Sequence, residues 1–307
     1  MLRYALRRLI VLPSTLLVIV TLAFFLMRLA PGGPFDQEQA IPPEIMANLE
    51  SAYGLDEPVL VQYANYLDRL LHGDLGPSFR MKDFTVAELI GRGLPVTLSV
   101  GSAALVLAVG LGVPLGLLAA RRHNRWTDHA VMTLALVGIA VPNFVVAPLL
   151  SLAFGIGLGW LPVAGWEPGS PRHLVLPVVT LALPLVAYVA RLTRGSLLEV
   201  LQAPFIRTAQ AKGISQAALL RRHALRPTLM PVVSFLGPAT AALLTGSLVV
   251  EQVFGLPGVG RYFVQGAINR DYTLVMGMVV FYAALILVLN LAVDLVYGWL
   301  DPRIRHD

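Results

Sequence analysis

Six long apolar runs alternate with polar segments along the chain. They cover residues 9–27, 95–120, 130–158, 174–190, 228–250 and 274–297. A helix needs about 20 predominantly apolar residues to cross a bilayer, and all six runs approach or exceed that length. The first run follows three arginines, as a signal peptide would, but the apolar core of a signal peptide is only about 7–15 residues long. The pattern therefore predicts an all-α polytopic membrane protein with six transmembrane helices, the first of them uncleaved.

Basic residues gather in the polar segments on one side of these runs. Segments 1–8, 121–129, 191–227 and 298–307 together hold fifteen Lys or Arg and four Asp or Glu. Cytoplasmic segments of membrane proteins carry an excess of Lys and Arg. We therefore expect these four segments, and with them both termini, to lie in the cytoplasm.

The longest segment on the opposite side, residues 30–94, is acidic, with ten acids against four bases. We expect one helix over residues 42–54 and a second that Pro58 opens. One face of the second helix would be apolar, and it would carry Val59, Leu60, Tyr63, Leu67, Leu70 and Leu71. Two interpretations stay open here. The segment is either a cap packed on the spans or a landing surface for an external partner.

Residues 191–227, which we call the elbow, form a polar island between two apolar runs, with seven Lys or Arg against one acid, Glu199. Gly213 is placed to end one short helix in the left-handed conformation. Ser215 is placed to cap a second helix, with Ile214 and Leu219 as a hydrophobic staple. The pattern predicts a stiff cytoplasmic hairpin of helices. The alternative is an amphipathic linker resting on lipid headgroups.

Residues 251–273, which we call the gate segment, follow the fifth apolar run directly. Glycines and a proline interrupt any simple helical continuation, at Gly255, Pro257, Gly258 and Gly260. Irregular backbone at membrane depth survives only where it is buried in protein or lines an aqueous cavity. We expect a bent, partly re-entrant loop that acts as a gate, and an ordinary surface turn is the alternative.

Composition agrees with a membrane protein, because 56% of the residues are hydrophobic, 13% are charged and the mean hydropathy is +0.72. Soluble domains usually carry about a quarter of charged residues. The net charge of +5 arises beside the apolar runs, which favours membrane topology over nucleic-acid binding as its cause. The chain has no cysteine, which excludes disulfides and thiolate metal sites.

The chain lacks the sequence motifs of several enzyme classes. Its only two lysines, Lys82 and Lys212, lie outside any G-x-x-x-x-G-K-[ST] motif, so we predict no nucleotide site and no ATPase activity. H-E-x-x-H and G-x-S-x-G are also missing, which counts against metalloprotease and hydrolase activity. An ion-driven transporter usually places ionisable residues at mid-membrane. Here the spans hold only Arg28 and Asp294, both near an interface.

Several motifs along the chain resemble those of the permeases of binding-protein-dependent ABC importers, in the peptide and nickel group and nearest to its oligopeptide branch. The motifs are MRLAPGGPF at 27–35, GDLGPSF at 73–79, GVPLGLLAA at 112–120, RTAQAKG at 207–213, RRHALRPTLMP at 221–231, FGLPGVG at 254–260, NRDY at 269–272 and DPRIR at 301–305. The resemblance implies the type I importer permease fold, with residues 1–29 as N-terminus and first span, 30–94 as a periplasmic helical segment, 95–297 as the permease core and 298–307 as the cytoplasmic C-terminus.

In this family the elbow corresponds to the loop that couples the permease to an ATPase subunit. Arg207, Thr208 and Ala209 stand where the general motif has Glu-Ala-Ala, and the resemblance extends the coupling role to Lys212, Gly213 and Leu225. The same resemblance assigns the gate role to a second set, which comprises Glu251, Phe254, Gly255, Pro257, Gly258 and Gly260.

The resemblance also implies the function and the partners of the chain. The expected function is that of a multi-pass permease subunit in the inner membrane, forming half of a pathway for oligopeptides. The expected partners are a homologous second permease, two ATPase subunits that hold ATP and magnesium, and a periplasmic peptide-binding protein; no cofactor is expected in this chain and no nucleic-acid partner. Dipeptides, nickel or another small substrate are the alternatives within the group, and an ion-driven secondary transporter is the alternative outside it.

Overall fold

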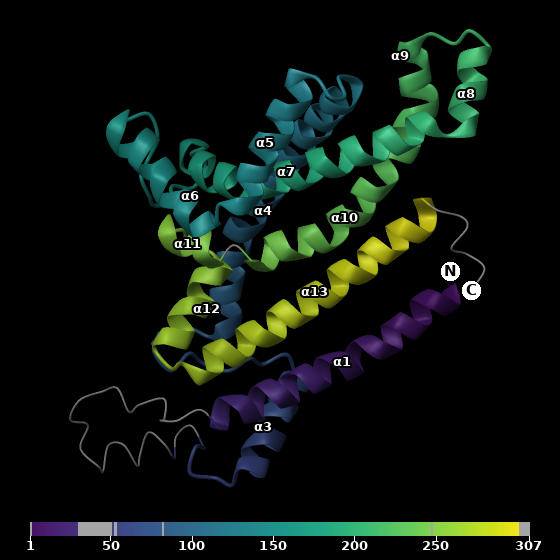
Figure 1. The fold of residues 1–307 in the computed structure, drawn as a ribbon. Helices are drawn as coiled ribbons and strands as arrows, with labels where there is room; N and C mark the ends of the chain where they lie inside the picture. The colour runs from purple at the N-terminus through teal and green to yellow at the C-terminus, as the bar shows by residue number, and fades with distance from the viewer. Residues whose placement is uncertain (1, 30–50, 52–53, 82, 247, 301–307) are drawn as a thin grey trace. The chain divides into compact units, whose positions relative to one another are not determined.

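The computed structural model describes residues 2–29, 51, 54–81, 83–246 and 248–300, which form an all-helical chain (Figure 1). Contacts group the chain into two compact units. The first unit comprises Thr97–Leu256 and Val288–Asp307, and the second comprises Leu2–Val96 and Pro257–Leu287. The helices in chain order are α1 (Leu2–Leu29), α3 (Val59–Leu71), α4 (Val86–Arg121), α5 (Trp126–Ala140), α6 (Asn143–Leu150), the π-helix η1 (Ser151–Gly157), α7 (Arg172–Gln202), α8 (Pro204–Ala211), α9 (Gln216–Leu219), the π-helix η2 (Leu220–Ala224), α10 (Leu225–Gly246), α11 (Leu248–Val253), α12 (Val259–Ile268) and α13 (Tyr272–Leu300).

Four helices of the described chain are long and apolar enough to cross a membrane, and they lie in the apolar runs that the sequence predicts. They are Val11–Leu29 of α1, α4, α7 and Tyr272–Ala292 of α13. A fifth span results if α5 is taken together with Asn143–Gly157, but these two pieces are bent by 103°. The predicted third span, 130–158, is therefore interrupted, because the helix breaks at Val141 and Pro142. The predicted fifth span, 228–250, falls on α10 and α11, which are not among the helices that meet the length and composition test.

The first unit is built around α7, which contacts α5 on one side and α10 on the other (Figure 1). Helix α4 approaches α7 closely at two glycines. A methyl group added to Gly116 would lie 2.4 Å from the carbonyl oxygen of Ala190, and one added to Gly112 would lie 2.7 Å from Cβ of Val189. Real side chains never come that near, so these two positions need glycine.

The second unit has its own apolar core, formed where the start of α4 meets α12 and α13. Six buried residues make up this core: Val86, Leu89, Ile90, Val259, Leu274 and Met278. Asp271 precedes α13 and caps it, because its Oδ1 accepts the backbone N–H of Leu274 at 3.0 Å. Its Oδ2 accepts a short hydrogen bond from the hydroxyl of Ser78. The end of the external segment is thereby fixed to the start of α13.

Two predicted elements of the external segment and the gate segment differ from the structure. The prediction of a covered apolar face on α3 is partly wrong. Leu60 and Leu71 are exposed, and the buried residue of the helix is the polar Gln62. Residues 259–268 of the gate segment are helical, where only loop was expected. The helix expected over 42–54 falls almost wholly outside the described residues, as does the side chain of Asp294.

Candidate functional site

The first arm of the elbow is α8, an amphipathic helix that begins and ends on specific residues. Pro204 occupies its first turn, where the missing N–H costs nothing. The helix ends at Ala211, and Gly213, which follows the C-cap residue Lys212, has a φ of +76°. There the N–H of Gly213 bonds to the carbonyl of Gln210 at 2.9 Å, and that of Ile214 to the carbonyl of Ala209 at 3.4 Å. This pair of bonds is the Schellman motif, so the predicted left-handed stop at Gly213 is confirmed.

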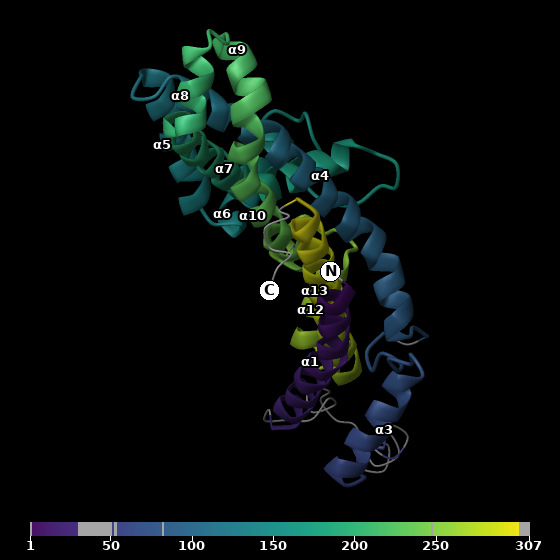
Figure 2. The same ribbon diagram turned by 90° about the vertical axis from the view of Figure 1, so that its right-hand side faces the viewer.

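The second arm runs without a break from α9 through η2 into α10. Ser215 stands at the N-cap position with extended backbone, as predicted, although its side chain makes no capping bond. Both arms lie side by side in two perpendicular views (Figures 1 and 2). They share one apolar core with the ends of α4 and α7, which consists of Ala120, Leu197, Ile206, Ala209, Leu219 and Ala224, with Ile214 packed against it. The elbow is therefore a packed hairpin and not a loose linker.

The predicted coupling residues divide between this core and the outer surface. Arg207, Thr208 and Lys212 are exposed along α8, whereas Ala209 is buried in the shared core. Gly213 is exposed at the tip, and a methyl group added there would meet nothing within 4 Å. Leu225, half-buried, is the first residue of α10. The hairpin thus presents a basic, small-residue edge of α8 that is open for contact.

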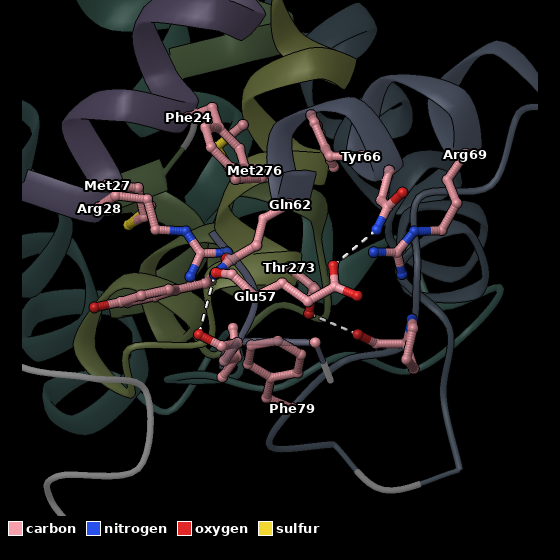
Figure 3. A pocket seen from close by; sticks show the side chains of 15 residues that line it. Phe24, Met27, Arg28, Glu57, Gln62, Tyr66, Arg69, Phe79, Thr273 and Met276 are labelled. Atoms are coloured by element: carbon pink, nitrogen blue, oxygen red, sulfur yellow. Dashed lines mark hydrogen bonds between the residues drawn. The ribbon is translucent and has the colours of Figure 1, made fainter. Parts of the chain in front are cut away.

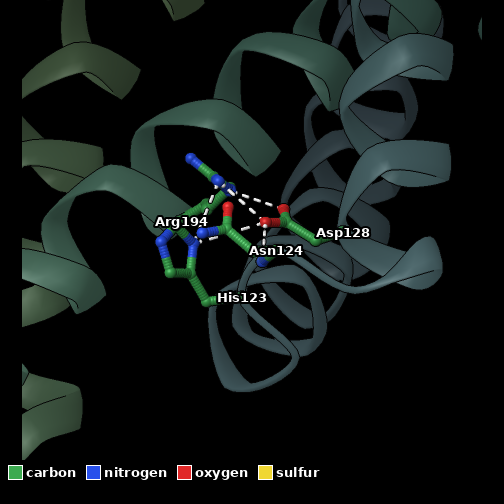
Figure 4. A network of polar contacts seen from close by, with 4 residues as sticks. All are labelled: His123, Asn124, Asp128 and Arg194. Atoms are coloured by element: carbon green, nitrogen blue, oxygen red, sulfur yellow. Dashed lines mark hydrogen bonds and ion pairs between the residues drawn. The ribbon is translucent and has the colours of Figure 1, made fainter.

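A buried ion pair supports the base of the elbow (Figure 4). The guanidinium of Arg194 in α7 donates to both carboxylate oxygens of Asp128 in α5, at 2.6 and 2.8 Å. The backbone N–H of Asn124 donates to the same carboxylate at 2.9 Å, and Nδ1 of His123 lies 3.4 Å from it. Asp128 is 1% exposed. Because bidentate Arg–carboxylate pairs fix both distance and orientation, the α4–α5 turn is locked to α7.

The first half of the gate segment lies in the first unit and is held by two hydrogen bonds to other parts of that unit. Glu251 is fully buried in α11, and its Oε1 accepts the hydroxyl of Thr97 at 2.7 Å. The carbonyl of Phe254 accepts the N–H of Gly165 at 2.7 Å. Gly255 then turns the chain with a φ of +65°. A turn in the left-handed region favours glycine, which accounts for this residue.

The second half of the gate segment lies in the second unit, where Pro257 leads into α12. Gly258 is the N-cap of that helix, and Gly258 and Gly260 are both buried. A methyl group added to Gly93 would lie 2.7 Å from the backbone nitrogen of Val259. The start of α12 is thus pressed against α4. The segment is bent, as expected, and partly buried, but much of it is helix rather than loop.

Several polar residues that hold these parts in place were not predicted from the sequence. Thr97, Asp128, Ser78 and Asp271 each bond to a partner far away in the chain. Asp128 carried a signal as the single acid in the basic segment 121–129, and Ser78 and Asp271 lie within the motifs GDLGPSF and NRDY, but nothing in the sequence marked Thr97. In the part of the chain that the structure describes, no group of three or more His, Cys, Asp or Glu is placed to hold a metal ion.

An all-helical chain with four helices long and apolar enough to cross a membrane, in the part that the structure describes, defines the class of polytopic membrane proteins. The chain belongs to the family of binding-protein-dependent transport system inner membrane components. The model of that family matches residues 112–306, and the model of its N-terminal region matches residues 1–101. The chain is therefore a membrane subunit and not an ATPase.

Curated relatives match the chain over its whole length. It is 48% identical over 306 residues, covering all of both chains, to the oligopeptide transport system permease protein of Salmonella typhimurium, and equally to that of Haemophilus influenzae. It is 45% identical to the dipeptide transport system permease protein of Bacillus subtilis, over 99% of this chain and 98% of that one.

Solved structures support the same fold at lower identity. A chain of the MetNI methionine ABC transporter, solved in inward-facing conformations, superposes with a TM-score of 0.60 at 19% identity, covering 69% of this chain and 96% of that one. A chain of an amino acid ABC transporter solved with histidines gives 0.51 at 21% identity, over 71% and 94%. These likenesses concern the fold alone.

Proposed function

We propose that this chain is the membrane permease of an ATP-driven ABC importer and forms half of a pathway that carries oligopeptides across the inner membrane. The observation that carries this proposal is the 48% identity to oligopeptide permeases over the full length of both chains. Dipeptides are the second candidate cargo, because the identity to a dipeptide permease is 45% over nearly the same length.

In this proposal the chain crosses the membrane six times in the arrangement of a type I importer permease, with both termini in the cytoplasm. The bent pair α5 and α6–η1 counts as one span, and α10 is the fifth. The basic segments place the elbow in the cytoplasm and the acidic segment 30–94 outside. This orientation puts the elbow on the side where ATP is available.

The elbow is the proposed contact with a motor. Its exposed edge would face one of two ATPase subunits, which hold ATP and magnesium. This edge consists of Arg207, Thr208 and Lys212. The shared apolar core and the Asp128–Arg194 pair would transmit a push on the elbow to α7. The gate segment would respond through Glu251 and Phe254, which are tied to other parts of the same unit.

Two further partners complete the proposed system. A homologous second permease would supply the other half of the pathway, and a periplasmic peptide-binding protein would deliver cargo to the outer side. Membership in a family of binding-protein-dependent membrane components supports the binding protein. The second permease is proposed from the resemblance of the motifs to this family.

The decisive experiment is peptide uptake by vesicles that contain this chain with its second permease and ATPase subunits. We expect uptake of a labelled tripeptide that requires the binding protein outside and ATP at the elbow side. Uptake should stop with a non-hydrolysable ATP analogue. Accumulation driven by an imposed ion gradient, with no ATP present, would instead favour the secondary transporter.

A further inference from the structure

The second unit contains a cavity of about 340 Å³ between the end of α1, α3 and the start of α13 (Figure 3). This volume falls at the lower end of the range for ligand sites, which fits a small molecule or one end of a longer one. Aromatic side chains make up much of the wall, among them Phe24, Tyr66, Phe79 and Tyr272. The cavity touches the gate segment only at its last two residues, Tyr272 and Thr273, and none of the residues assigned a coupling or gate role lines it. The proposed machinery therefore does not account for it.

The positively charged side chain of Arg28 lies among these aromatic rings. The guanidinium carbon of Arg28 lies 5.2 Å from the ring centre of Phe24 and 5.8 Å from that of Tyr272, both within cation–π range. Within the described part of the chain, these two rings are the contacts of the Arg28 guanidinium. Arg69 also lines the cavity. A guanidinium that keeps its N–H donors available is the group that recognises carboxylates best.

Two polar atoms of the wall have no hydrogen-bond partner among the described residues. The amide nitrogen of Gln62 donates to the carbonyls of Leu55 and Glu57 at 3.0 and 2.7 Å, which fixes the orientation of the amide. Its Oε1 is left buried and unpaired, and so is the hydroxyl of Tyr66. Gln62 is 9% exposed. Buried polar atoms are nearly always paired, so these two indicate groups that a ligand would supply after a small side-chain rotation.

The needs of the wall are chemically specific. Arg28 favours an anion, Gln62 Oε1 accepts an N–H donor, and Tyr66 is able to donate. The carboxylate of Glu57 also lines the cavity, where it accepts a hydrogen bond from Nδ2 of Asn65 at 2.9 Å. Burial raises the pKa of Tyr66 to about 12, although Arg69 nearby lowers it, so the hydroxyl keeps its proton at neutral pH. A peptide carboxyl end offers a carboxylate with an amide N–H two bonds away from its carbon, and a side chain for the aromatic wall.

We propose that this cavity binds the carboxyl-terminal end of a peptide, with the carboxylate at Arg28 and the last amide N–H at Gln62. The inference rests on the proposed function, because it makes the cavity an outer-side subsite for the transported cargo. The end of α1 and the start of α13 belong to the segments assigned to that side, where cargo would arrive.

Binding of trialanine to the full chain in lipid nanodiscs tests the proposal, with trialanine amide, N-acetyl-trialanine and free alanine as comparison probes. We expect N-acetylation to be tolerated and the C-terminal amide to bind at least about tenfold more weakly, since it loses a charge-assisted bond. Free alanine lacks the amide N–H and should also bind more weakly. Equal affinity for the acid and the amide, or no binding at millimolar concentration, overturns the proposal.

Two variants tie that binding to the cavity. Tyr66→Phe deletes an unpaired hydroxyl and should leave the fold intact while weakening trialanine about three- to tenfold, the usual effect of one hydrogen bond. Arg28→Gln should abolish the preference for acid over amide. Arg92→Gln is the matched control, because Arg92 also stacks on a ring, that of Phe84 at 4.5 Å, but lies outside the cavity.

The same variants in the vesicle assay separate this inference from the proposed function. If wild-type vesicles import trialanine with ATP but Tyr66→Phe and Arg28→Gln bind it as the wild type does, only the cavity proposal fails. If wild-type vesicles import no peptide although the chain binds trialanine at the cavity, only the proposed function fails.

Discussion

At the scale of single residues, two glycines are explained by their backbone conformation and two buried acids by their pairing with distant residues. Gly213 and Gly255 are needed for their left-handed backbone. Asp128 and Glu251 are charged side chains with almost no solvent exposure, and each is paired with a group from another element. The sequence indicates the glycines directly, since a glycine after a polar helical stretch has a structural meaning. The sequence does not indicate the two pairs, because Asp128 and Arg194 lie 66 positions apart in the chain, and Thr97 and Glu251 lie 154 positions apart.

Gly213→Val should uncouple ATP hydrolysis from peptide uptake. The added Cβ meets no atom within 4 Å, so the cost comes from the left-handed φ, about 1–2 kcal/mol for a residue with a Cβ. That cost re-aims α9 and should lower uptake about five- to thirtyfold, while the protein still accumulates in the membrane. Uptake and ATP hydrolysis are measured together in vesicles.

Two controls accompany Gly213→Val. Gly195→Val adds the same side chain in open space at a helical φ within α7, and it should retain coupling. Gly213→Asn should recover part of it, because asparagine tolerates the left-handed region better. Normal coupled transport by the valine variant would remove the elbow from the mechanism.

Asp128→Asn should destabilise the first unit. It removes the charge from a carboxylate that Arg194 holds with two hydrogen bonds, and it leaves a partly buried guanidinium without its counter-ion. We expect the free energy of unfolding to fall by about 1–3 kcal/mol, measured by denaturant titration of the purified chain in micelles. Asp68→Asn is the control, because its partner His72 is 3.8 Å away and both side chains are exposed; a loss as large in this control would contradict the argument.

At the scale of elements, the helices were predictable and their interruptions were not. Runs of apolar residues locate α1, α4, α7 and α13 well, because length and hydropathy alone define a span. The break at Val141 and Pro142 and the helical character of 259–268 depend on packing that periodicity does not record. The elbow was predicted closely, since its proline, glycine and cap residues act locally.

Gly116→Ala should separate α4 from α7. The added methyl group would clash with backbone at 2.4 Å, which a side-chain rotation cannot relieve. Overpacking of this kind costs about 1–3 kcal/mol. Gly110→Ala in the same helix meets nothing within 4 Å, and it should be neutral or stabilising by up to about 1 kcal/mol.

The thermal stability of both purified glycine variants in micelles provides the measurement. Equal melting temperatures for Gly116→Ala and Gly110→Ala would show that the two helices do not approach each other as closely as described.

At the scale of the whole molecule, the chain is a membrane component, and the proposed function makes it the part that transmits motion from a separate ATPase. It contains no nucleotide-binding motif, and its family comprises membrane components. How 30–94 functions as a unit stays a prediction. Its last residues belong to the core of the second unit, through Val86, Leu89 and Ile90, so deleting the whole segment would also remove packing from α12 and α13.

Purified alone, the chain should hydrolyse ATP no faster than empty micelles. Adding the ATPase subunits should restore hydrolysis, and the binding protein loaded with peptide should stimulate it. Phosphate release is the measurement. Robust hydrolysis by the isolated chain, retained through further purification, would contradict the division of roles between the subunits.

The π-helical turn η2 sets the angular phase of the elbow. A π turn closes each backbone hydrogen bond one residue later than an α turn, so the continuous rod from α9 to α10 carries a surplus residue at 220–224. Each residue of an α-helix advances the chain by about 100° around its axis. Loss of one residue from η2 would let the rod close as a regular α-helix and would swing the rest of the hairpin by about that angle, with all its side chains unchanged. The direction in which the elbow faces thus depends on the number of residues in η2. Deleting one residue there would rotate the hairpin about the helix axis without changing the side chains that it presents.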